Sequence, residues 1–412
     1  MLKESLGEPS VVRKDLFIAS ALLFNAFSWH YIAYIVIESL LSIINPTYTQ
    51  NLVVWLTHYL VVIGSGLVGS IISTRVSRVK FLYLWILLGI VSSALPALFS
   101  TFTVAYILMI SVLLGASFGL GMPSCFAYFA DYTSVENRGK ISGITWLVTN
   151  LSAPFFAISS SMFDLKMNSL ILAAWRAFGL VVFFFLKPKE RMVSETKRKT
   201  SFVSILQDKS FVLYLAAWLM FNLVESFERP ILDYIFGDFH YVLVAPVIGS
   251  FFTLIAGILC DQIGRKRVVL YGFVTMGIAY GIIGIAPTAL FPWYFFLTTE
   301  SISWGIFFVT FILVLWGDLS ESGNREKYYV IGAATPYFLS DIVRMISAPY
   351  VVLIPPTSAF SVASFFLFIA VLPLLYAPET LPERKIELRR LRKYVETAKE
   401  VQQKYAEKVA RG

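Results

Sequence analysis

The chain has 412 residues, of which 57% are hydrophobic and only 15% are charged, and its mean hydropathy is +0.72. This composition lies outside the range of soluble globular domains and predicts a membrane protein. The net charge of +8 comes from bases concentrated in a few loops, so it indicates membrane topology and does not favour binding of nucleic acid.

Apolar stretches of about 20 residues recur along nearly the whole chain, and each can cross a hydrocarbon core of ~30 Å. We therefore expect an all-α membrane protein with twelve transmembrane helices. In chain order, the expected spans are roughly 16–42, 51–72, 81–99, 102–129, 141–163, 168–187, 210–230, 238–260, 268–287, 291–317, 329–351 and 355–377.

The distribution of Lys and Arg predicts the orientation. Most of them lie at the N-terminus, in the C-terminal tail, or in loops that follow even-numbered spans. By the positive-inside rule, both termini of this multi-pass protein are then cytoplasmic, and we expect it in the plasma membrane. The first hydrophobic run is too long for a cleavable signal peptide. Cys125 and Cys260 are expected near cytoplasmic helix ends, where thiols stay reduced, so no disulfide is expected.

A charged pattern occurs twice in the sequence, 187 residues apart. Asp131 is followed after six residues by Arg138, and Asp318 is followed after six residues by Arg325. The chain therefore looks like two copies of one unit of about 190 residues. Two further pairs keep nearly the same offset: Glu38 with Glu225, and Gly69 with Gly257.

The repeat predicts two pseudo-symmetric six-helix bundles, about 1–187 and 210–377. A basic linker rich in Ser and Thr, 188–209, is expected to join them in the cytoplasm. Over 378–412, apolar residues recur at three- and four-residue steps among charged ones, which predicts an amphipathic cytoplasmic helix. This helix could rest on the membrane face or bind a regulatory partner.

Three motifs resemble those of the major facilitator superfamily. GILCDQIGRKR, from Gly257 to Arg267, matches the Gly-x-x-x-Asp-x-x-Gly-Arg-Lys loop of that family. The two Asp-x6-Arg elements resemble the acidic-x6-Arg-Gly loop of its sugar-porter branch. Pro378-Glu379-Thr380 resembles the sequence that closes many of those porters. The resemblance covers the chain from the first to the twelfth span. It implies a monomeric secondary transporter that works by alternating access.

The loop from Gly257 to Arg267, in the second copy, is a candidate cytoplasmic gate. Gly257 and Asp261 lie four residues apart on one helical face, so a neighbouring helix could approach closely beside a carboxylate. Gly264 permits a sharp turn, after which the bases from Arg265 to Arg267 would lie level with the lipid headgroups. Alternatively, these bases serve only to enforce topology.

The Asp-x6-Arg elements are the second part of this candidate gate. Asp131 with Arg138, and Asp318 with Arg325, could each form an ion pair across a loop. Such pairs would hold the cytoplasmic side shut and break when it opens.

Several positions depart from the family pattern. Ser73 and Val76 replace the acid and the glycine in the first copy, which predicts a weaker or differently built gate there. Ser111 stands where many proton-coupled members carry Arg, and the seventh span lacks the Gln-Gln pair of sugar porters. Gly121-Met122-Pro123 and Thr335-Pro336 could bend the fourth and eleventh spans.

Ionisable residues within the spans are few and costly to bury, so they are candidates for the substrate and proton pathway. Glu38 and Glu225 occupy equivalent repeat positions, and in the resembling family their helices face each other across a central cavity. Burial favours the neutral carboxyl, so these side chains could exchange protons near neutrality. His30 and His58 could relay protons, or they could be hydrogen-bonded core residues. The further candidates are Asn222, Arg176, Glu300 and the pair Asp341 and Arg344, which could instead neutralise each other.

The sequence thus predicts proton-coupled symport of a polar metabolite, such as a sugar or an organic acid. Efflux of organic cations or drugs is an alternative, as is a membrane sensor that does not transport. An enzyme is not expected, because three His and two Cys, all scattered, form no metal site or nucleophile–base pair. The expected partners are a small solute, protons and the lipid bilayer, with no cofactor.

Overall fold

The computed structural model describes residues 13–99, 101–188, 200–236 and 244–382. Within these ranges the regular secondary structure is helical, without strands. Eleven helices there are long and apolar enough to cross a membrane. A twelfth span, over 325–351, consists of three consecutive helical segments. The twelve predicted spans are therefore confirmed. The linker residues 189–199 and the tail from 383, where most of the amphipathic helix was predicted, lie outside the described residues.

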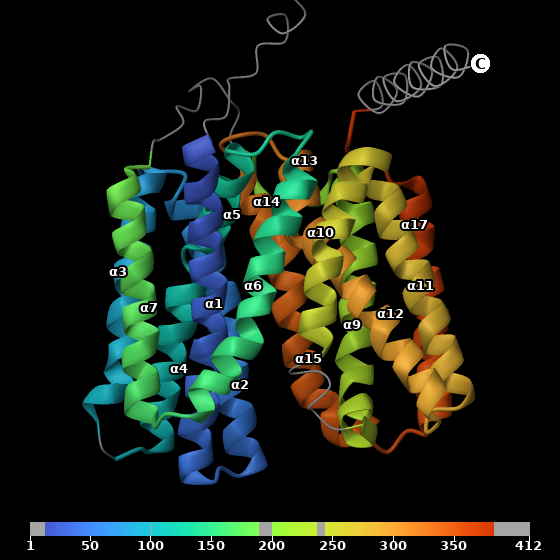
Figure 1. Ribbon diagram of the computed structural model, residues 1–412, viewed down its shortest axis with the longest axis horizontal. Helices are drawn as coiled ribbons and strands as arrows, with labels where there is room; N and C mark the ends of the chain where they lie inside the picture. The colour runs from blue at the N-terminus through green and yellow to red at the C-terminus, as the bar shows by residue number, and fades with distance from the viewer. Residues whose placement is uncertain (1–12, 100, 189–199, 237–243, 383–412) are drawn as a thin grey trace, which may run out of the picture.

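The chain forms two groups of helices that lie side by side (Figure 1). The first group consists of α1 (Arg13–Ile44), α2 (Tyr48–Ile72), α3 (Arg78–Ala94), η1 (Leu95–Leu98), α4 (Val104–Gly119), α5 (Met122–Asp131), α6 (Arg138–Ser161) and α7 (Leu165–Leu186). The short α8 (Phe202–Leu206) precedes the second group. That group consists of α9 (Lys209–Phe236), α10 (Ala245–Ile263), α11 (Arg265–Ile285), α12 (Leu290–Phe307), η3 (Phe308–Val314), α13 (Leu315–Leu319), α14 (Arg325–Tyr329), η4 (Val330–Ala334), α15 (Thr335–Val351), α16 (Pro356–Ile369) and α17 (Val371–Tyr376).

Local sequence explains several helix starts. The Thr47 side chain accepts a hydrogen bond from the Gln50 backbone, and the Gln50 side chain accepts one from the Thr47 backbone, which is a complete capping box. Thr103 and Asp164 cap α4 and α7 in the simpler way, through one side-chain oxygen. These caps satisfy backbone N–H groups that have no partner within their helices.

The regular α-helix is interrupted at both sites where a bend was predicted. The fourth span passes from α4 to α5 at Gly121-Met122-Pro123, and a Cβ on Gly121 would lie 2.2 Å from the Trp85 ring. In the eleventh span, the π-helical turn η4 lies directly before Thr335-Pro336. The Thr335 hydroxyl donates to the Val330 carbonyl at 2.7 Å. This bond gives one carbonyl of the widened turn a hydrogen-bond partner.

The two groups meet chiefly where α6 packs on α10 and where α2 packs on α15. Small residues allow the first contact, since a Cβ on Gly143 would lie 2.5 Å from the Thr253 carbonyl oxygen. The Thr253 hydroxyl donates to the Gly143 carbonyl at 3.1 Å across the same contact. The helix axes can therefore approach closely, as in other membrane helix pairs with small residues.

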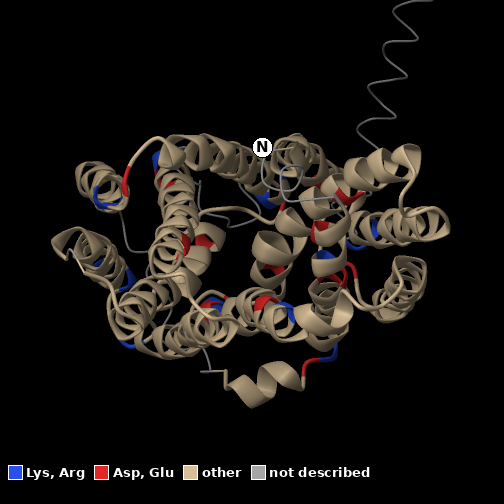
Figure 2. Ribbon diagram, turned by 90° about the horizontal axis from the view of Figure 1, so that it is seen from below, with Lys and Arg blue, Asp and Glu red and all other residues tan. Residues whose placement is uncertain are grey.

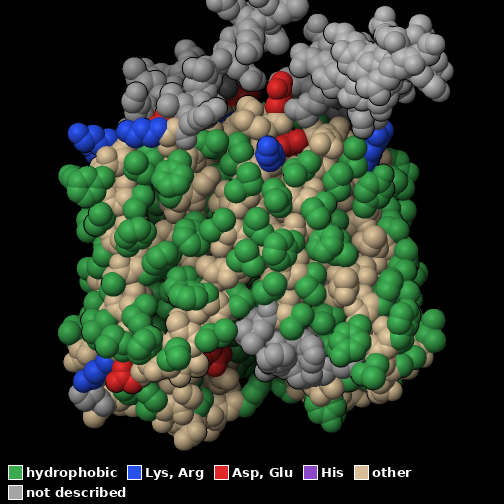
Figure 3. Space-filling model, viewed as in Figure 1, with side chains coloured by type: hydrophobic (Ala, Val, Ile, Leu, Met, Phe, Trp, Pro, Cys, Tyr) green, Lys and Arg blue, Asp and Glu red, His purple; other side chains and the backbone are tan. Residues whose placement is uncertain are grey.

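Charged side chains lie along the upper edge of the molecule and at one corner of the lower edge, and the surface between them is largely hydrophobic (Figure 3). We call the upper end the basic face, because four helices begin there at an arginine: Arg78, Arg138, Arg265 and Arg325. It is uppermost in Figure 1, and the opposite face is called the far face. Viewed from the far face, most acidic positions lie around the middle of the molecule, whereas several basic positions lie on outer helices (Figure 2).

Candidate functional site

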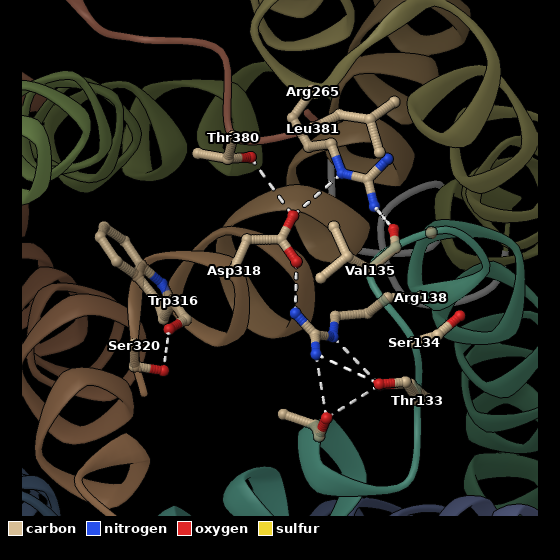
Figure 4. Close-up of polar contacts among 12 residues, drawn as sticks. Thr133, Ser134, Val135, Arg138, Arg265, Trp316, Asp318, Ser320, Thr380 and Leu381 are labelled. Carbon is tan, nitrogen blue, oxygen red and sulfur yellow. Dashed lines mark hydrogen bonds and ion pairs between the residues drawn. The ribbon is translucent and has the colours of Figure 1, made fainter. Parts of the chain in front are cut away.

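A network of buried ion pairs joins the two groups of helices at the basic face (Figure 4). Asp318 accepts from Arg138 of the first group at one carboxylate oxygen and from Arg265 of its own group, at 3.0 Å, at the other. Asp131 likewise accepts from Arg325 of the second group, at 2.6 Å, and from Arg78 of its own. The side chains of both aspartates are fully buried.

This network has the symmetry of the sequence repeat. Arg265 and Asp318 lie 187 residues after Arg78 and Asp131, and each aspartate is bonded to one arginine from each group. The Arg138–Asp318 pair corresponds in the same way to the pair of Arg325 with Asp131. The repeat is thus visible in the contacts as well as in the sequence.

The pairing differs from the one predicted, because Arg138 and Arg325 bond across the groups rather than within their own loops. The geometry of the loop explains the difference. Arg138 uses its inward-facing nitrogens on its own loop for the Ala130 carbonyl, at 2.9 Å, and the Thr133 hydroxyl, at 3.0 Å. Its remaining nitrogen points outward, toward the aspartate of the other group.

Asp261 caps a helix of the opposite group. Its two carboxylate oxygens accept from the backbone of Gly139, at 2.9 Å, and of Lys140, at 2.7 Å, at the N-terminus of α6. A carboxylate at this end of a helix also interacts favourably with the helix dipole. The contact needs small residues, since a Cβ on Gly257 would lie 2.2 Å from the Gly139 carbonyl oxygen. The predicted close approach beside a carboxylate is therefore present.

Arg265 is buried within the protein, and its depth relative to the headgroups stays a prediction. Its residue exposure is 0%, and its guanidinium bonds to Asp318, to the Cys260 carbonyl and to the Val135 carbonyl. Gly264 has a φ of +105°, as the predicted sharp turn requires, and this turn directs the arginine inward.

The Pro378-Glu379-Thr380 segment completes this part of the network. Glu379 accepts from the backbone of Arg265, at 2.8 Å, and of Lys266, at 3.2 Å, at the start of α11. The Thr380 hydroxyl donates to Asp318 at 3.3 Å. The segment thus fastens the end of the last span to the network.

Arg78 and Glu326 are members of the network that the sequence analysis missed. Arg78 lies 2.5 Å from the buried Glu326 carboxylate of the other group, in addition to its bond with Asp131. The 187-residue offset between Arg78 and Arg265 could have revealed the arginine. In the second copy Arg265 contacts the motif acid Asp261 at 3.2 Å, whereas in the first copy Ser73 stands at that position and Arg78 contacts Glu326. The first copy is therefore built differently, as predicted.

A cavity of about 700 Å³ lies between the two groups and extends from mid-depth to the far face. Near the far face it is lined by Glu38 and Ser160, close to the ends of α1 and α6, and at depth by Phe126. Phe126 contacts Tyr329 of the other group, with ring centroids 5.2 Å apart, between the cavity and the ion network. The outline of the molecule is notched between the groups at the far face (Figure 3).

Ten aromatic residues make up much of the cavity wall. Several of them pack against one another, as for example Phe27 and Trp146 do edge to face, with ring centroids 5.0 Å apart. The aromatic lining residues are Phe27, Tyr31, Tyr34, Tyr59, Phe126, Trp146, Trp304, Phe308, Tyr337 and Phe338.

Five of the predicted pathway residues line the cavity: His30, Glu38, Glu300, Asp341 and Arg344. Asp341 and Arg344 form an ion pair of 2.7 Å, as their three-residue spacing allows. Arg229, which the sequence analysis did not select, also lines the cavity and pairs with Asp233 at 3.0 Å.

Glu225 is buried but does not line the cavity. The Tyr280 hydroxyl on α11 donates to it at 3.4 Å, so its carboxylate faces the interior of the second group. Asn222, one turn earlier, donates to the Trp218 carbonyl at 2.7 Å, and it is likewise absent from the wall. The expectation that Glu38 and Glu225 both face the cavity therefore holds for Glu38 alone.

The two histidines of the first group lie close together. The His30 and His58 rings are nearly parallel, with centroids 5.8 Å apart, and Phe118 stacks on His30 at 3.8 Å. His58 is fully buried, and its Nδ1 lies 3.1 Å from the Ser111 carbonyl oxygen. His30 Nδ1 and His58 Nε2 have no hydrogen-bond partner among the described residues. His30 thus connects the cavity to a buried second imidazole.

Arg176 lies inside the first group, away from the cavity. Its guanidinium packs on the rings of Trp29, at 5.2 Å, and Trp85, at 4.2 Å, and donates to the Asn25 side chain at 2.9 Å. These cation–π contacts stabilise a buried cation without a carboxylate. The geometry indicates a packing role.

Solved structures of transporters have a similar fold. The human organic anion transporter MFSD10 (TETRAN) aligns with a TM-score of 0.70 at 13% identity, over 89% of this chain and 100% of its own. The proton:xylose symporter XylE of the major facilitator superfamily aligns with a TM-score of 0.67 at 15% identity, over 90% of this chain and 97% of its own. The sequence matches no protein-family model and no curated sequence.

The arrangement of the helices is therefore that of a major facilitator superfamily transporter. The chain accordingly has the architecture of a multi-pass membrane protein, with a cavity between the two groups of helices.

Proposed function

We propose that the protein is a secondary active transporter that moves a small solute by alternating access. The observation that carries this proposal is that the cavity is open to one face of the molecule and closed to the other. The cavity reaches the far face, whereas the ion network and the Phe126–Tyr329 contact separate it from the basic face. A carrier in one of its two end states has this form.

In this proposal the halves 1–187 and 210–377 rock as units, and the network is the gate of the closed end state. Opening the basic face separates Arg138 from Asp318 and Arg325 from Asp131, and it removes Asp261 from the start of α6. In this proposal the basic face is the cytoplasmic one, as the positive-inside rule favours. The transporter acts as a monomer, since each chain contains a whole cavity.

We further propose that transport is coupled to protons through Glu38, His30 and His58. Glu38 and His30 line the cavity, where they can exchange protons with water, and His58 stacks parallel to His30. Symport of a polar metabolite, such as a sugar or an organic acid, follows from the sugar-porter-like motifs. Glu225, which does not line the cavity, would then contribute to the coupling indirectly, through its hydrogen bond with Tyr280.

Transport of an organic cation is the second candidate function, and the composition of the wall favours it. Three acidic residues line the cavity against two arginines, and each of these arginines is paired with an aspartate. The aromatic faces around them can bind a cation. The wall therefore also suits an amphipathic cation.

Transport in proteoliposomes tests the proposal. Thermal-shift screening of the purified chain against sugars, carboxylates and organic cations selects a candidate solute, and its uptake is then measured with and without a pH gradient. We expect accumulation that the gradient drives and that Glu38→Gln abolishes. Uptake that is indifferent to the gradient would remove proton coupling, and binding without transport would support a sensor instead.

A further inference from the structure

The second half of the protein has an apolar pocket that opens sideways, toward the hydrocarbon of the membrane. It has a volume of about 410 Å³ and lies between α9, the end of α15 and α16. Phe227, Val362 and Phe366 line it, and they are 43%, 53% and 45% exposed on the outer surface. The pocket is separate from the central cavity, with which it shares no lining residue.

Glu228 is the one ionisable side chain among the described residues that line this pocket. It is only 5% exposed, and its Oε2 atom has no hydrogen-bond partner among the described residues. Its neighbour Arg229 does not compensate for it, because Arg229 lines the central cavity and pairs with Asp233. An ionised carboxylate buried among apolar groups is costly unless a ligand of opposite charge pairs with it.

The pocket has a polar end near the far face and an apolar end deeper in the molecule. Ser358 lies in the first turn of α16 and Glu228 in the last third of α9, so both are near the far face. Met220 and Phe366 lie eight residues further from that face along the same helices, which places them ~12 Å deeper by helical rise. A membrane amphiphile of the far-face leaflet has the same order, with its headgroup outward and its tail toward the midplane.

We propose that this pocket binds a single-chain amphiphile with a primary amine headgroup, taken from the far-face leaflet, whose ammonium pairs with Glu228. The Ser358 hydroxyl lines the same end of the pocket and can accept a second hydrogen bond from the ammonium. The tail lies along Met220, Leu223 and Phe366. An anionic headgroup would be repelled by the carboxylate, and a neutral alcohol would leave its charge unpaired.

A pocket in the first half provides an internal comparison. It lies between α1, α6 and α7, has a volume of about 580 Å³ and is also largely apolar. Its described lining residues include Asn25 and Thr145 but no acidic side chain. Such a pocket can accept a lipid tail but offers no preference for an amine.

Binding of dodecylamine and of dodecanol to the full chain in phosphatidylcholine nanodiscs tests the proposal. The two probes have equal tails and differ in the headgroup. We expect dodecylamine to bind about tenfold more tightly or better, which corresponds to ~1.4 kcal/mol for the pairing of one buried charge. Glu228→Gln should abolish this preference while leaving the binding of dodecanol unchanged.

Two further variants make the test decisive. Glu38→Gln removes an acid of the central cavity and should keep the preference for the amine. Ala359→Phe fills the pocket beside α16 and should weaken the binding of both probes, even if Glu228→Gln does not fold. Equal binding of amine and alcohol would overturn the proposal. So would a preference that survives Glu228→Gln or that depends on Glu38, because the amine would then occupy another site.

Discussion

The substitution Gly257→Ala should open the basic face. Its added Cβ would lie 2.2 Å from the Gly139 carbonyl oxygen, whereas an ordinary contact needs at least 3.4 Å, so α6 and α10 must move apart by about an ångström. That displacement lengthens the bonds from Gly139 and Lys140 to Asp261, which are 2.9 and 2.7 Å long.

Hydrogen bonds to a charged group contribute ~1.5–3 kcal/mol each, so the loss of both destabilises the closed state by about 3 kcal/mol or more. A difference of this size shifts the equilibrium between the two end states about a hundredfold toward opening at the basic face. Ala130, which is fully buried near the network, can report this shift as Ala130→Cys in a chain whose native cysteines are replaced by Ser.

The assay is the rate at which a maleimide modifies this cysteine in nanodiscs. We expect the rate to rise by up to about a hundredfold in Gly257→Ala, in proportion to the open population. Gly64→Ala is the matched control, because a Cβ at Gly64 meets nothing within 4 Å, and it should leave the rate unchanged. An unchanged rate in a folded Gly257→Ala protein would refute the role of this contact in holding the face shut.

Three further predictions concern the network and the coupling. Asp261→Asn should slow transport with little change in solute affinity, since the carboxylate stabilises one end state without lining the cavity; equal loss of binding in detergent would contradict this. Gly264→Ala should lower the unfolding temperature by a few degrees, because its φ of +105° and ψ of +155° cost other residues ~1–3 kcal/mol; an unchanged melting curve would show that the turn relaxes. Glu225→Gln should abolish accumulation and flatten its pH dependence while exchange down a gradient survives; normal accumulation would remove Glu225 from the coupling.

The sequence predicted the fold because membrane spans and duplicated motifs are local signals. Twelve apolar stretches and the 187-residue offset need no knowledge of tertiary contacts, and both correspond to features of the structure. The glycines at 257 and 264 were also readable, since close approach and a positive φ leave few other residue types possible.

The partners of the charged residues could not be predicted from local sequence. A six-residue spacing suggested that Arg138 bonds to Asp131, but the same symmetry also permits the exchanged pair with Asp318, which is the one formed. Arg265 was expected level with the headgroups because a basic triplet usually marks topology. Asp261 and the Cys260 carbonyl, which it also contacts, lie within five residues of it, but the Asp318 carboxylate and the Val135 carbonyl that complete its burial come from distant parts of the sequence.

Glu225 and Glu228 show a second limit. The sequence places both residues on one helix, α9, but the surroundings of each carboxylate depend on how the neighbouring helices pack. Glu225 faces Tyr280 inside the second half, and Glu228 faces a pocket that opens to the membrane. Arg229, the residue that follows Glu228, is the one that lines the cavity.

The most direct test of alternating access is the side from which one cavity residue can be modified. Asn150 lines the cavity, and Asn150→Cys in oriented proteoliposomes can be labelled with a membrane-impermeant maleimide from either face. We predict labelling from the far face in the otherwise unchanged chain. In Asp318→Asn, which breaks bonds to two arginines, labelling should shift to the basic face, and Asp164→Asn, a helix cap outside the network, should have no effect. Simultaneous labelling from both faces, or labelling of the Asp318→Asn protein from the far face alone, would contradict the account.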